Sequence, residues 1–384
     1  MSETKFSKLD HQFMARAIQL AKRGQFTTSP NPNVGCVIAD ITGNIVGEGW
    51  HHKAGTAHAE VHALRQAGEL AKGATAYVTL EPCSHQGRTP PCADALIHSQ
   101  VGRVVIAMED PNPLVSGEGV QKLKNAGIVT ATGLLTSAAE QLNRGFIKRM
   151  KTGQPWVTVK LASTLDGKTA LQNGLSQWIT GPMARQDVQR HRAKSCAILS
   201  GSGTVMADNP SLNVRYAELG LSADDLLLGN LRQPLRVILD GRNQLPSSLV
   251  CLQSIQKNQA GDVLLINGQV SQHEFAEHVE QWQAPFNNNK LDLPAVMSKL
   301  SDMQLNHIWV EAGAKLAGAL LQNNLVDELI LYQAPKLIGA AGQNLFDILP
   351  IESMQEVVDL SITDVRQVGE DIKITALLNK KSVN

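Results

Sequence analysis

Net charge is absent from this sequence, because 35 lysine and arginine residues balance 35 aspartate and glutamate residues. A chain without a basic field has little to attract a phosphate polymer, so we expect no nucleic-acid partner. No stretch approaches the roughly 18 uninterrupted apolar residues that a membrane helix needs, and residues 1–13 lack the apolar segment of a secretory signal. The sequence therefore predicts a cytoplasmic protein with no membrane partner.

Cysteine is also scarce, and its five positions are Cys36, Cys83, Cys92, Cys196 and Cys251. An odd and sparse set is typical of reduced thiols rather than of a disulfide framework, so metal binding or catalysis is the better use to look for. Hydrophobic residues make up 43% of the chain and charged residues 18%, which excludes disorder over most of its length. At roughly 150 residues per domain, 384 residues predict two or three domains.

Helical and strand patterns alternate through the first 150 residues. An amphipathic helix around residues 13–21 precedes a hairpin of residues 34–50, and a helix over 58–71 and further strands and helices follow. This order is typical of a layered α/β domain whose sheet is largely parallel beyond the hairpin. Pro155 opens a new apolar run after the basic end of a helix, so we predict two domains, 1–150 and 151–384.

The second domain alternates in the same way. Strand-like runs occupy residues 156–162, 196–201, 235–240, 262–267, 307–313 and 328–335. Helical patterns cover residues 182–193, 272–282, 293–301 and 315–323. These segments predict a second α/β domain with its own sheet.

Three candidate metal ligands stand in the first domain. His58 lies at the start of a predicted helix, Cys83 directly follows a strand and Pro82, and Cys92 follows a loop of eight residues. One imidazole and two thiolates leave the fourth position of a zinc ion for water, as a catalytic site requires. A helix N-terminus at Cys83 would lower the pKa of its thiol and favour metal binding.

Glu60 completes this pattern. His-X-Glu followed by Pro-Cys and a second cysteine marks the zinc nucleobase deaminases, in which a glutamate that is not a ligand carries protons. The common pattern has two residues between the cysteines, whereas this chain has eight. A closed structural site remains the alternative, and it would need a fourth ligand, for which His62 and His85 are the nearest candidates.

Two glycine-rich turns follow strands of the second domain. Gly201-Ser202-Gly203-Thr204 is not a dinucleotide-binding fingerprint of the Rossmann type, because position 206 is methionine rather than glycine. Such a turn can still bring backbone N–H groups to a pyrophosphate, and residues 313–319 offer a second helix start of this kind. Two such turns on neighbouring strands suit a dinucleotide.

The strings SPNPNVGCVI, HAEVHAL, YVTLEPCSHQGRTPPC and MEDPNPLVSGEG resemble the deaminase half of the bifunctional pyrimidine deaminase/reductases of riboflavin biosynthesis. VKLASTLDGKTA, SQWIT, GSGTVMADNPSLNVR and VEAGAKLAGALL are similar to the reductase half of that family. The resemblance covers nearly the whole chain. It implies a cytidine-deaminase-like three-layer α/β/α domain, a dihydrofolate-reductase-like α/β domain, zinc and NADPH as cofactors, a pyrimidine nucleotide substrate and a homo-oligomer.

The resemblance also implies roles for individual residues. Glu60 would be catalytic, and His58, Cys83 and Cys92 would bind zinc. The substrate in the deaminase half would be surrounded by Asn31, His51, Arg88 and Thr89, and in the reductase half by Lys160, Ser176, Arg192, Leu212, Arg215 and Glu311. NADPH would be lined by Ala162, Trp178, Thr204, Asp208, Gly241, Gly313, Ala314, Lys315, Leu316, Ala317, Gly318 and Ala319, with Arg242 as a contact for its 2′-phosphate.

Two other functions remain as alternatives. A deaminase of tRNA or of free nucleosides would share the zinc centre, although the neutral charge and the second domain count against it. One domain could instead be a binding or scaffolding module around a structural zinc. A Glu60→Ala variant separates these, because a catalytic site loses ammonia release while it keeps its zinc.

Overall fold

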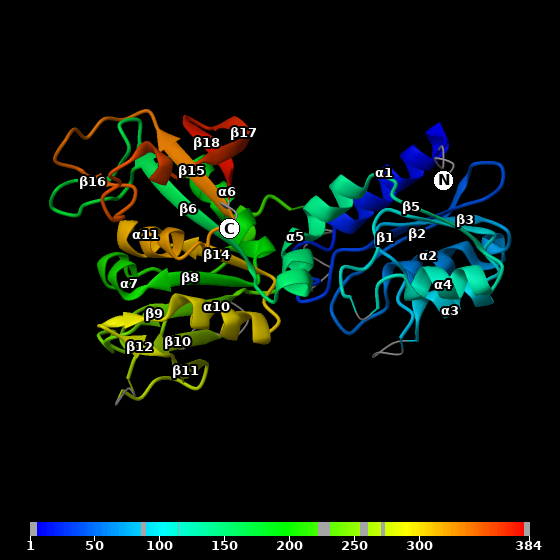
Figure 1. The fold of residues 1–384 in the computed structure, drawn as a ribbon, viewed down its shortest axis with the longest axis horizontal. Helices are drawn as coiled ribbons and strands as arrows, with labels where there is room; N and C mark the ends of the chain where they lie inside the picture. The colour runs from blue at the N-terminus through cyan, green and yellow to red at the C-terminus, as the bar shows by residue number, and fades with distance from the viewer. Residues whose placement is uncertain are drawn as a thin grey trace. The chain divides into compact units, whose positions relative to one another are not determined.

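The computed structural model describes residues 6–85, 90–113, 115–221, 231–253, 260–269 and 273–379. The chain divides into two compact units, one up to Gln154 and one from Pro155 onward. In Figure 1 the first unit runs from blue to blue-green and the second from green to red. No helix in the described ranges is long and apolar enough to cross a membrane.

The first unit is built on a five-stranded sheet in the order β2-β1-β3-β4-β5. β1 pairs antiparallel with both of its neighbours, while β3, β4 and β5 run parallel. The predicted hairpin is thus present, and the sheet is parallel beyond it. The strands are β1 (Gly35–Ala39), β2 (Ile45–Trp50), β3 (Thr75–Val78), β4 (Arg103–Ile106) and β5 (Val129–Thr132).

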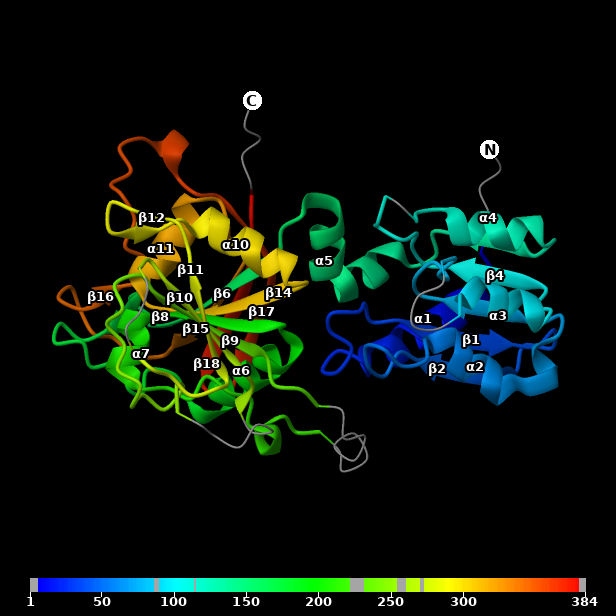
Figure 2. The same cartoon turned by 90° about the horizontal axis from the view of Figure 1, so that it is seen from below.

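Helices cover both faces of this sheet, which makes three layers. α1 (Lys8–Lys22) and α5 (Thr136–Thr152) pack on one face. The other face carries α2 (Ala59–Ala67), followed by a 3₁₀ turn over Gly68–Ala71, and then α3 (Cys92–His98) and α4 (Glu118–Asn125). α3 and α4 are neighbours there (Figure 2).

Two helices approach the hairpin backbone directly. A Cβ atom added to Gly35 of β1 would collide with the carbonyl oxygen of Ala17 in α1. In β2, a Cβ atom on Gly47 or Gly49 would collide with backbone carbonyl oxygens of α2. These positions require glycine because only a hydrogen atom fits between the helix and the strand.

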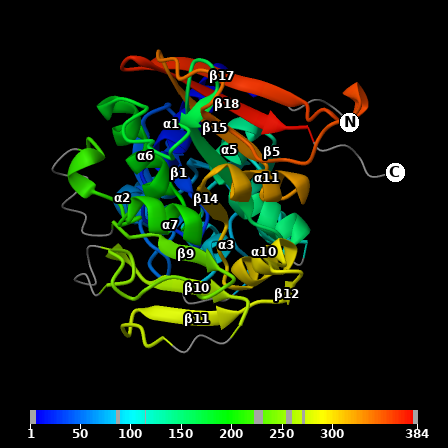
Figure 3. The same cartoon turned by 90° about the vertical axis from the view of Figure 1, so that its left-hand side faces the viewer.

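The second unit is built on a nine-stranded sheet in the order β11-β10-β9-β8-β14-β6-β15-β18-β17 (Figure 3). The strands from β11 to β15 run parallel, and β18 and β17 add an antiparallel edge. The strands are β6 (Trp156–Thr164), β8 (Ala197–Gly201), β9 (Leu235–Asp240), β10 (Val263–Asn267), β11 (Val279–Gln283), β14 (His307–Glu311), β15 (Glu328–Ala334), β17 (Leu360–Val368) and β18 (Asp371–Leu378).

Helices of the described ranges cover both faces of this sheet. α10 (Leu293–Asp302) and α11 (Ala314–Gln322) pack on one face, and α6 (Pro182–Lys194) and α7 (Ser202–Asp208) on the other. Small elements lie outside the sheet: β7 (Lys168–Ala170) pairs with β16 (Gln343–Asn344), β12 (Phe286–Asn287) pairs with β13 (Lys290–Leu291), and 3₁₀ turns occupy Tyr216–Glu218 and Met354–Glu356. The predicted fold class, two α/β domains of which the first has three layers, is confirmed.

One predicted helix is wrong. Residues 272–282 were expected to be helical, yet Val279–Gln283 form β11, which pairs in parallel with β10 along its whole length. Residue 272 lies outside the described ranges, and residues 273–278 are not helical. Pairing with the open edge of β10 satisfies a row of backbone groups, and this outweighs the local helical spacing.

Candidate functional sites

The three sequence-predicted metal ligands converge in the first unit. His58 is the N-cap residue of α2, Cys83 lies in the loop after β3, and Cys92 is the first residue of α3. His58 Nδ1 lies 3.6 Å from Cys83 Sγ and 3.3 Å from Cys92 Sγ. Within the part of the chain that the structure describes, these three residues form a cluster of potential metal-ligating atoms. The cluster includes neither His62 nor His85, the candidates for a fourth ligand.

Cys83 is prepared for metal binding by its hydrogen bonds. Cys92 and His58 both contact its sulfur, and they lower the pKa of the Cys83 thiol despite burial. The thiolate is the form that binds a metal. α3 begins at Cys92 rather than at Cys83, but the backbone N–H of Cys92 donates to Cys83 Sγ at 3.2 Å, so the start of a helix does face this sulfur.

Glu60 lies in the first turn of α2 and is 3% exposed. Its Oε2 is buried and has no hydrogen-bond partner in the part of the chain that the structure describes. Burial raises the pKa of Glu60 to about 7, and the Cys83 thiolate adds to this effect. A carboxyl group with this pKa can both accept and return a proton near neutral pH, as general acid–base catalysis requires.

His51 and Asn31 stand beside the metal ligands. The ring of His51 meets that of His58 edge-on at 5.2 Å, and burial lowers the pKa of His51 to about 4, so the ring is neutral. Its Nδ1 contacts the Ala57 carbonyl oxygen at 3.2 Å, and its Nε2 contacts the Asn31 amide at 3.1 Å. The Ala57 oxygen can only accept, so Nδ1 carries the proton and Nε2 accepts from Asn31. Arg88 and Thr89 lie outside the described residues.

Glu81 was not predicted from the sequence. Its carboxylate accepts backbone N–H groups from four residues: Asp110, Gly117, Gly119 and Val120. It thereby ties the segment before α4 to the loop that carries Cys83, two residues further along the chain. The N–H groups that donate to its carboxylate lie about 30 to 40 residues further along the chain, so no local sequence pattern predicts these bonds.

A large cleft lies in the second unit at the carboxyl ends of the parallel strands, where open α/β sheets bind their ligands. The predicted residues that line it are Lys160, Ala162, Ser176, Trp178, Arg192, Thr204, Asp208, Leu212, Arg215, Gly241, Glu311, Gly313, Ala314, Lys315, Leu316 and Ala319, together with Arg242. Ala317 and Gly318 do not line it. The Ala317 side chain packs in the core, and a Cβ atom on Gly318 would collide with the backbone of Asp347.

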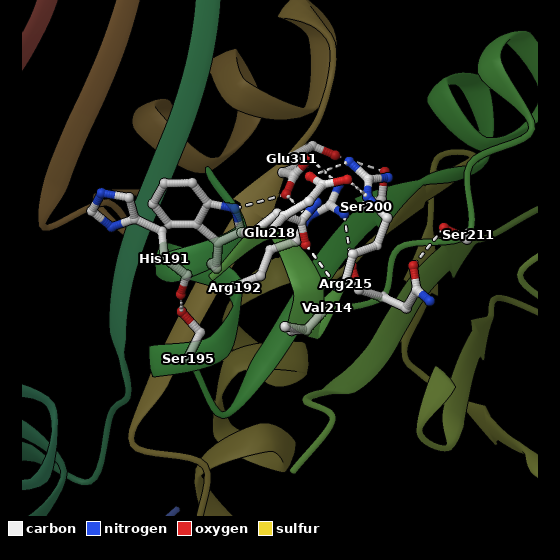
Figure 4. Close-up of polar contacts among 12 residues, drawn as sticks. His191, Arg192, Ser195, Ser200, Ser211, Val214, Arg215, Glu218 and Glu311 are labelled. Carbon is white, nitrogen blue, oxygen red and sulfur yellow. Dashed lines mark hydrogen bonds and ion pairs between the residues drawn. The ribbon is translucent and has the colours of Figure 1, made fainter. Parts of the chain in front are cut away.

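Glu311 and Arg192 form a two-pronged ion pair in this cleft (Figure 4). Arg192 Nε and Nη2 donate to Oε1 and Oε2 of Glu311 at 2.6 and 2.9 Å. Burial alone would raise the pKa of Glu311, but the guanidinium and its bonds outweigh burial and lower this pKa to about 2. Burial also lowers the pKa of Lys160, which faces the same pair. Glu311 is thus a charged strand end that is paired with an arginine inside the cleft.

Arg215 also lines the cleft. It donates from Nε and Nη2 to the carboxylate of Glu218 at 2.5 and 3.0 Å, and both side chains are partly exposed (Figure 4). Its backbone N–H donates to Gln189 Oε1 at 2.9 Å. The segment that carries Arg215 is therefore attached to α6, the helix that carries Arg192.

The two glycine-rich turns meet at the same end of the sheet. Gly201 is the N-cap residue of α7 and Gly313 that of α11. The Gly313 N–H donates to Thr204 Oγ1 at 3.1 Å, which joins the turns. A Cβ atom on Gly203 would meet open space, so a ligand can approach this backbone closely.

Comparison with known families agrees with these two sites. Residues 7–108 match the model of the cytidine and deoxycytidylate deaminase zinc-binding region, and residues 155–374 match the RibD C-terminal domain. Fold and sites thus define a zinc-binding deaminase region that is joined to a reductase. The riboflavin biosynthesis protein RibD of Escherichia coli K12 is 52% identical over 364 residues, which are 94% of this chain and 98% of that protein.

Solved structures extend the match. Acinetobacter baumannii RibD is 45% identical, with a TM-score of 0.87, and covers 97% of this chain and 99% of its own. The diaminohydroxyphosphoribosylaminopyrimidine deaminase/5-amino-6-(5-phosphoribosylamino)uracil reductase of Thermotoga maritima is 33% identical, with a TM-score of 0.84, over 96% of this chain and 99% of its own. The chain belongs to the RibD family. It is a bifunctional enzyme of riboflavin biosynthesis with a zinc-binding deaminase region and an NADPH-dependent reductase.

Proposed function

We propose that residues 1–150 hydrolytically deaminate 2,5-diamino-6-ribosylamino-4(3H)-pyrimidinone 5′-phosphate, and that residues 151–384 reduce the ribosyl group of the product to a ribityl chain. One observation carries the first half: a buried carboxylate oxygen of Glu60 without a partner among the described residues, beside three converging ligand atoms. The second half is supported by the cleft, which gathers several arginines, Arg192 and Arg215 among them, and two glycine-rich turns.

The donor set of the first site fits zinc, because one imidazole and two thiols within 4.8 Å of one another leave a coordination position open. Bound zinc supplies Lewis acidity, which makes water nucleophilic at neutral pH. His58, Cys83 and Cys92 would hold the ion. Glu60 would accept the proton of the attacking water and deliver it to the departing amine, since its pKa of about 7 permits both transfers.

The second cleft fits a dinucleotide at its glycine-rich turns and a phosphate monoester at its arginines. Bound NADPH supplies the hydride. Arg192 and Arg215 would hold the substrate phosphate and ribose. Glu311 is an ionised carboxylate with no proton to give at neutral pH, whereas burial eases proton release from Lys160, so we assign the proton donor to Lys160.

We also propose a homo-oligomer in the cytoplasm. The edge strand β17 exposes Ile362 and Val365 by 63% and 59%, which favours a covering surface. None of the five cysteines forms a disulfide, as a reducing compartment would ensure. Sedimentation velocity measures the assembly, and a monomer at micromolar concentration would contradict it.

A Glu60→Gln variant tests the deaminase. We expect ammonia release to fall at least about a hundredfold, because the amide cannot carry the proton. Zinc content, measured by atomic emission, should stay at one ion per chain, and NADPH oxidation with 5-amino-6-(5-phosphoribosylamino)uracil should persist. Undiminished ammonia release removes Glu60 from the mechanism, and loss of zinc along with the activity favours a structural role.

A further inference from the structure

Trp309 lies in the centre of the second unit and was not assigned a role above. It is the third residue of β14, between β8 and β6, and its side chain is fully buried. Successive side chains of a strand alternate between the two faces of the sheet. Trp309 therefore shares a face with Glu311, two residues along the strand, and this face is the one that α6 covers.

The only polar atom of the indole, Nε1, forms a hydrogen bond with Glu311. Trp309 Nε1 donates to Glu311 Oε1 at 2.8 Å, and Oε1 also accepts Arg192 Nε, while Oε2 accepts Arg192 Nη2. An ionised carboxylate has about four acceptor positions. These bonds fill three of them, two on Oε1 and one on Oε2. Glu311 thus presents one acceptor position to a ligand, on Oε2.

The indole ring is itself held in place by a second contact, on one of its faces. The ring of His191 stacks on Trp309 with centroids 4.7 Å apart and an angle of 7° between the planes. Lys373 Nζ donates to His191 Nε2 at 2.6 Å, so this nitrogen carries no proton and the ring is neutral. Asp187 balances the lysine: it accepts from Lys373 at 2.6 Å and from the Tyr332 hydroxyl at 2.6 Å.

These contacts form a continuous support from β18 to the cleft. Lys373 on β18 and Asp187 on α6 fix the His191 ring, the ring fixes the indole plane, and the indole N–H fixes Oε1 of Glu311. His191 precedes Arg192 on α6. One helix therefore carries both the ring that stacks on Trp309 and the guanidinium that pairs with Glu311. Figure 4 shows His191, Arg192 and Glu311 in the same region of the unit.

We propose that Trp309 is a positioning residue of the reductase, which orients the Glu311 carboxylate so that its one remaining acceptor position faces a hydroxyl group of the substrate. The inference rests on the proposed substrate contact of Glu311. Without the indole N–H the carboxylate can turn about its χ angles and fill that position with another donor. The pyrimidine nucleotide should then bind more weakly, while NADPH, which is assigned to the glycine-rich turns, should not.

The test is a Trp309→Phe variant, assayed by NADPH oxidation with 5-amino-6-(5-phosphoribosylamino)uracil. We expect KM for this substrate to rise about tenfold, as for loss of a hydrogen bond to a charged group, with KM for NADPH within twofold of wild type. Trp282→Phe on the edge strand β11 is the matched control and should change neither constant. Replacing Trp309 by 3-benzothienylalanine keeps the ring shape and removes the N–H, which covers the case in which the phenylalanine variant does not fold.

A double-mutant cycle with Glu311→Gln shows whether Trp309 acts through Glu311. Adding Trp309→Phe to Glu311→Gln should raise KM no further. The inference is overturned if KM stays unchanged in both Trp309 replacements while Glu311→Gln raises it, if the two effects multiply, or if KM for NADPH rises in parallel. An unchanged KM in Glu311→Gln alone removes the proposed contact of Glu311 and the positioning role with it.

Discussion

At the scale of single residues, Glu218 forms an ion pair with Arg215, the arginine that is proposed to bind the substrate phosphate. It is three residues from Arg215 and receives both prongs of its guanidinium. A carboxylate and a phosphate both bind the two parallel N–H donors of a guanidinium, so they compete for the same arginine. The ion pair is partly exposed, so it is weak enough for a dianion to displace.

A Glu218→Gln variant should therefore bind the pyrimidine phosphate more tightly. We expect KM to fall about threefold at low salt, with kcat unchanged, and the difference to shrink as salt screens the pair. Steady-state NADPH oxidation at two ionic strengths measures this. Asp364→Asn, which breaks a similar fork with Arg366 away from the cleft, is the control. A higher KM in Glu218→Gln would show that the carboxylate helps to place Arg215.

Residue types and spacing were enough to predict that the three candidate metal ligands come together and to propose Glu60 beside them, because these side chains come from one short motif set. The surroundings that give them their properties could not be predicted. The burial that raises the pKa of Glu60 comes from packing, and the donors of Glu81 lie in a distant segment. Trp309 was missed because a tryptophan in an apolar strand has the pattern of an ordinary core residue.

At the scale of secondary-structure elements, α1 begins with a capping box that also reaches across the sheet. Ser7 and Asp10 exchange side-chain-to-backbone hydrogen bonds. Asp10 further accepts Arg103 Nη1 at 2.7 Å and the Tyr77 hydroxyl at 2.8 Å. Burial would raise the pKa of Asp10, but Arg103 and the other donors outweigh it and hold this pKa well below its usual range.

Asp10→Asn should lower the free energy of unfolding of the first unit by about 2 kcal/mol at pH 7. Because the folded pKa lies below the unfolded value of about 3.9, the stabilisation is complete above pH 5 and is lost as pH falls from about 4 toward the folded pKa. Urea unfolding at pH 7 and pH 3.5 should thus show a gap that narrows on acidification. An equal difference between wild type and Asp10→Asn at both pH values would contradict this. Asp94→Asn, which removes the exposed ion pair with Lys122, is the control and should leave the free energy of unfolding unchanged at both pH values.

Most elements of the fold followed from periodicity, and the exceptions at the two sheet edges share one cause. α10 and α11 lie where their apolar spacing predicts them. β11 and β17 were not predicted, since each is an edge strand that is exposed on much of its surface. What forms such a strand is a neighbour's open row of backbone groups, which is a property of the folded sheet. β18 lies between β15 and β17, and its alternation of Ile372, Ile374 and Ala376 with polar residues is a signal that could have predicted it.

At the scale of the whole molecule, each unit has its own hydrophobic core and its own site. The proposed zinc ligands belong entirely to the first unit, and the cleft is lined entirely by residues of the second. The two activities should therefore depend on zinc to different degrees.

Removing zinc with a chelator, or through Cys83→Ser, should abolish ammonia release and leave most of the NADPH oxidation with the deaminated substrate. A colorimetric zinc assay follows the metal, and Cys251→Ser, a buried thiol of the second unit, serves as the control. Parallel loss of both activities, restored together by added zinc, would show that the reductase depends on the metal centre.

The bare contacts at Gly35, Gly47 and Gly49 have a consequence for how this enzyme can vary. Main-chain atoms of α1 and α2 rest on main-chain atoms of the hairpin, so the height of these helices above the sheet does not depend on the volume of any core side chain. His58 stands at the start of α2 and inherits that height. Interior residues under α2 can therefore change in size over generations with little effect on the height of the His58 imidazole above the sheet.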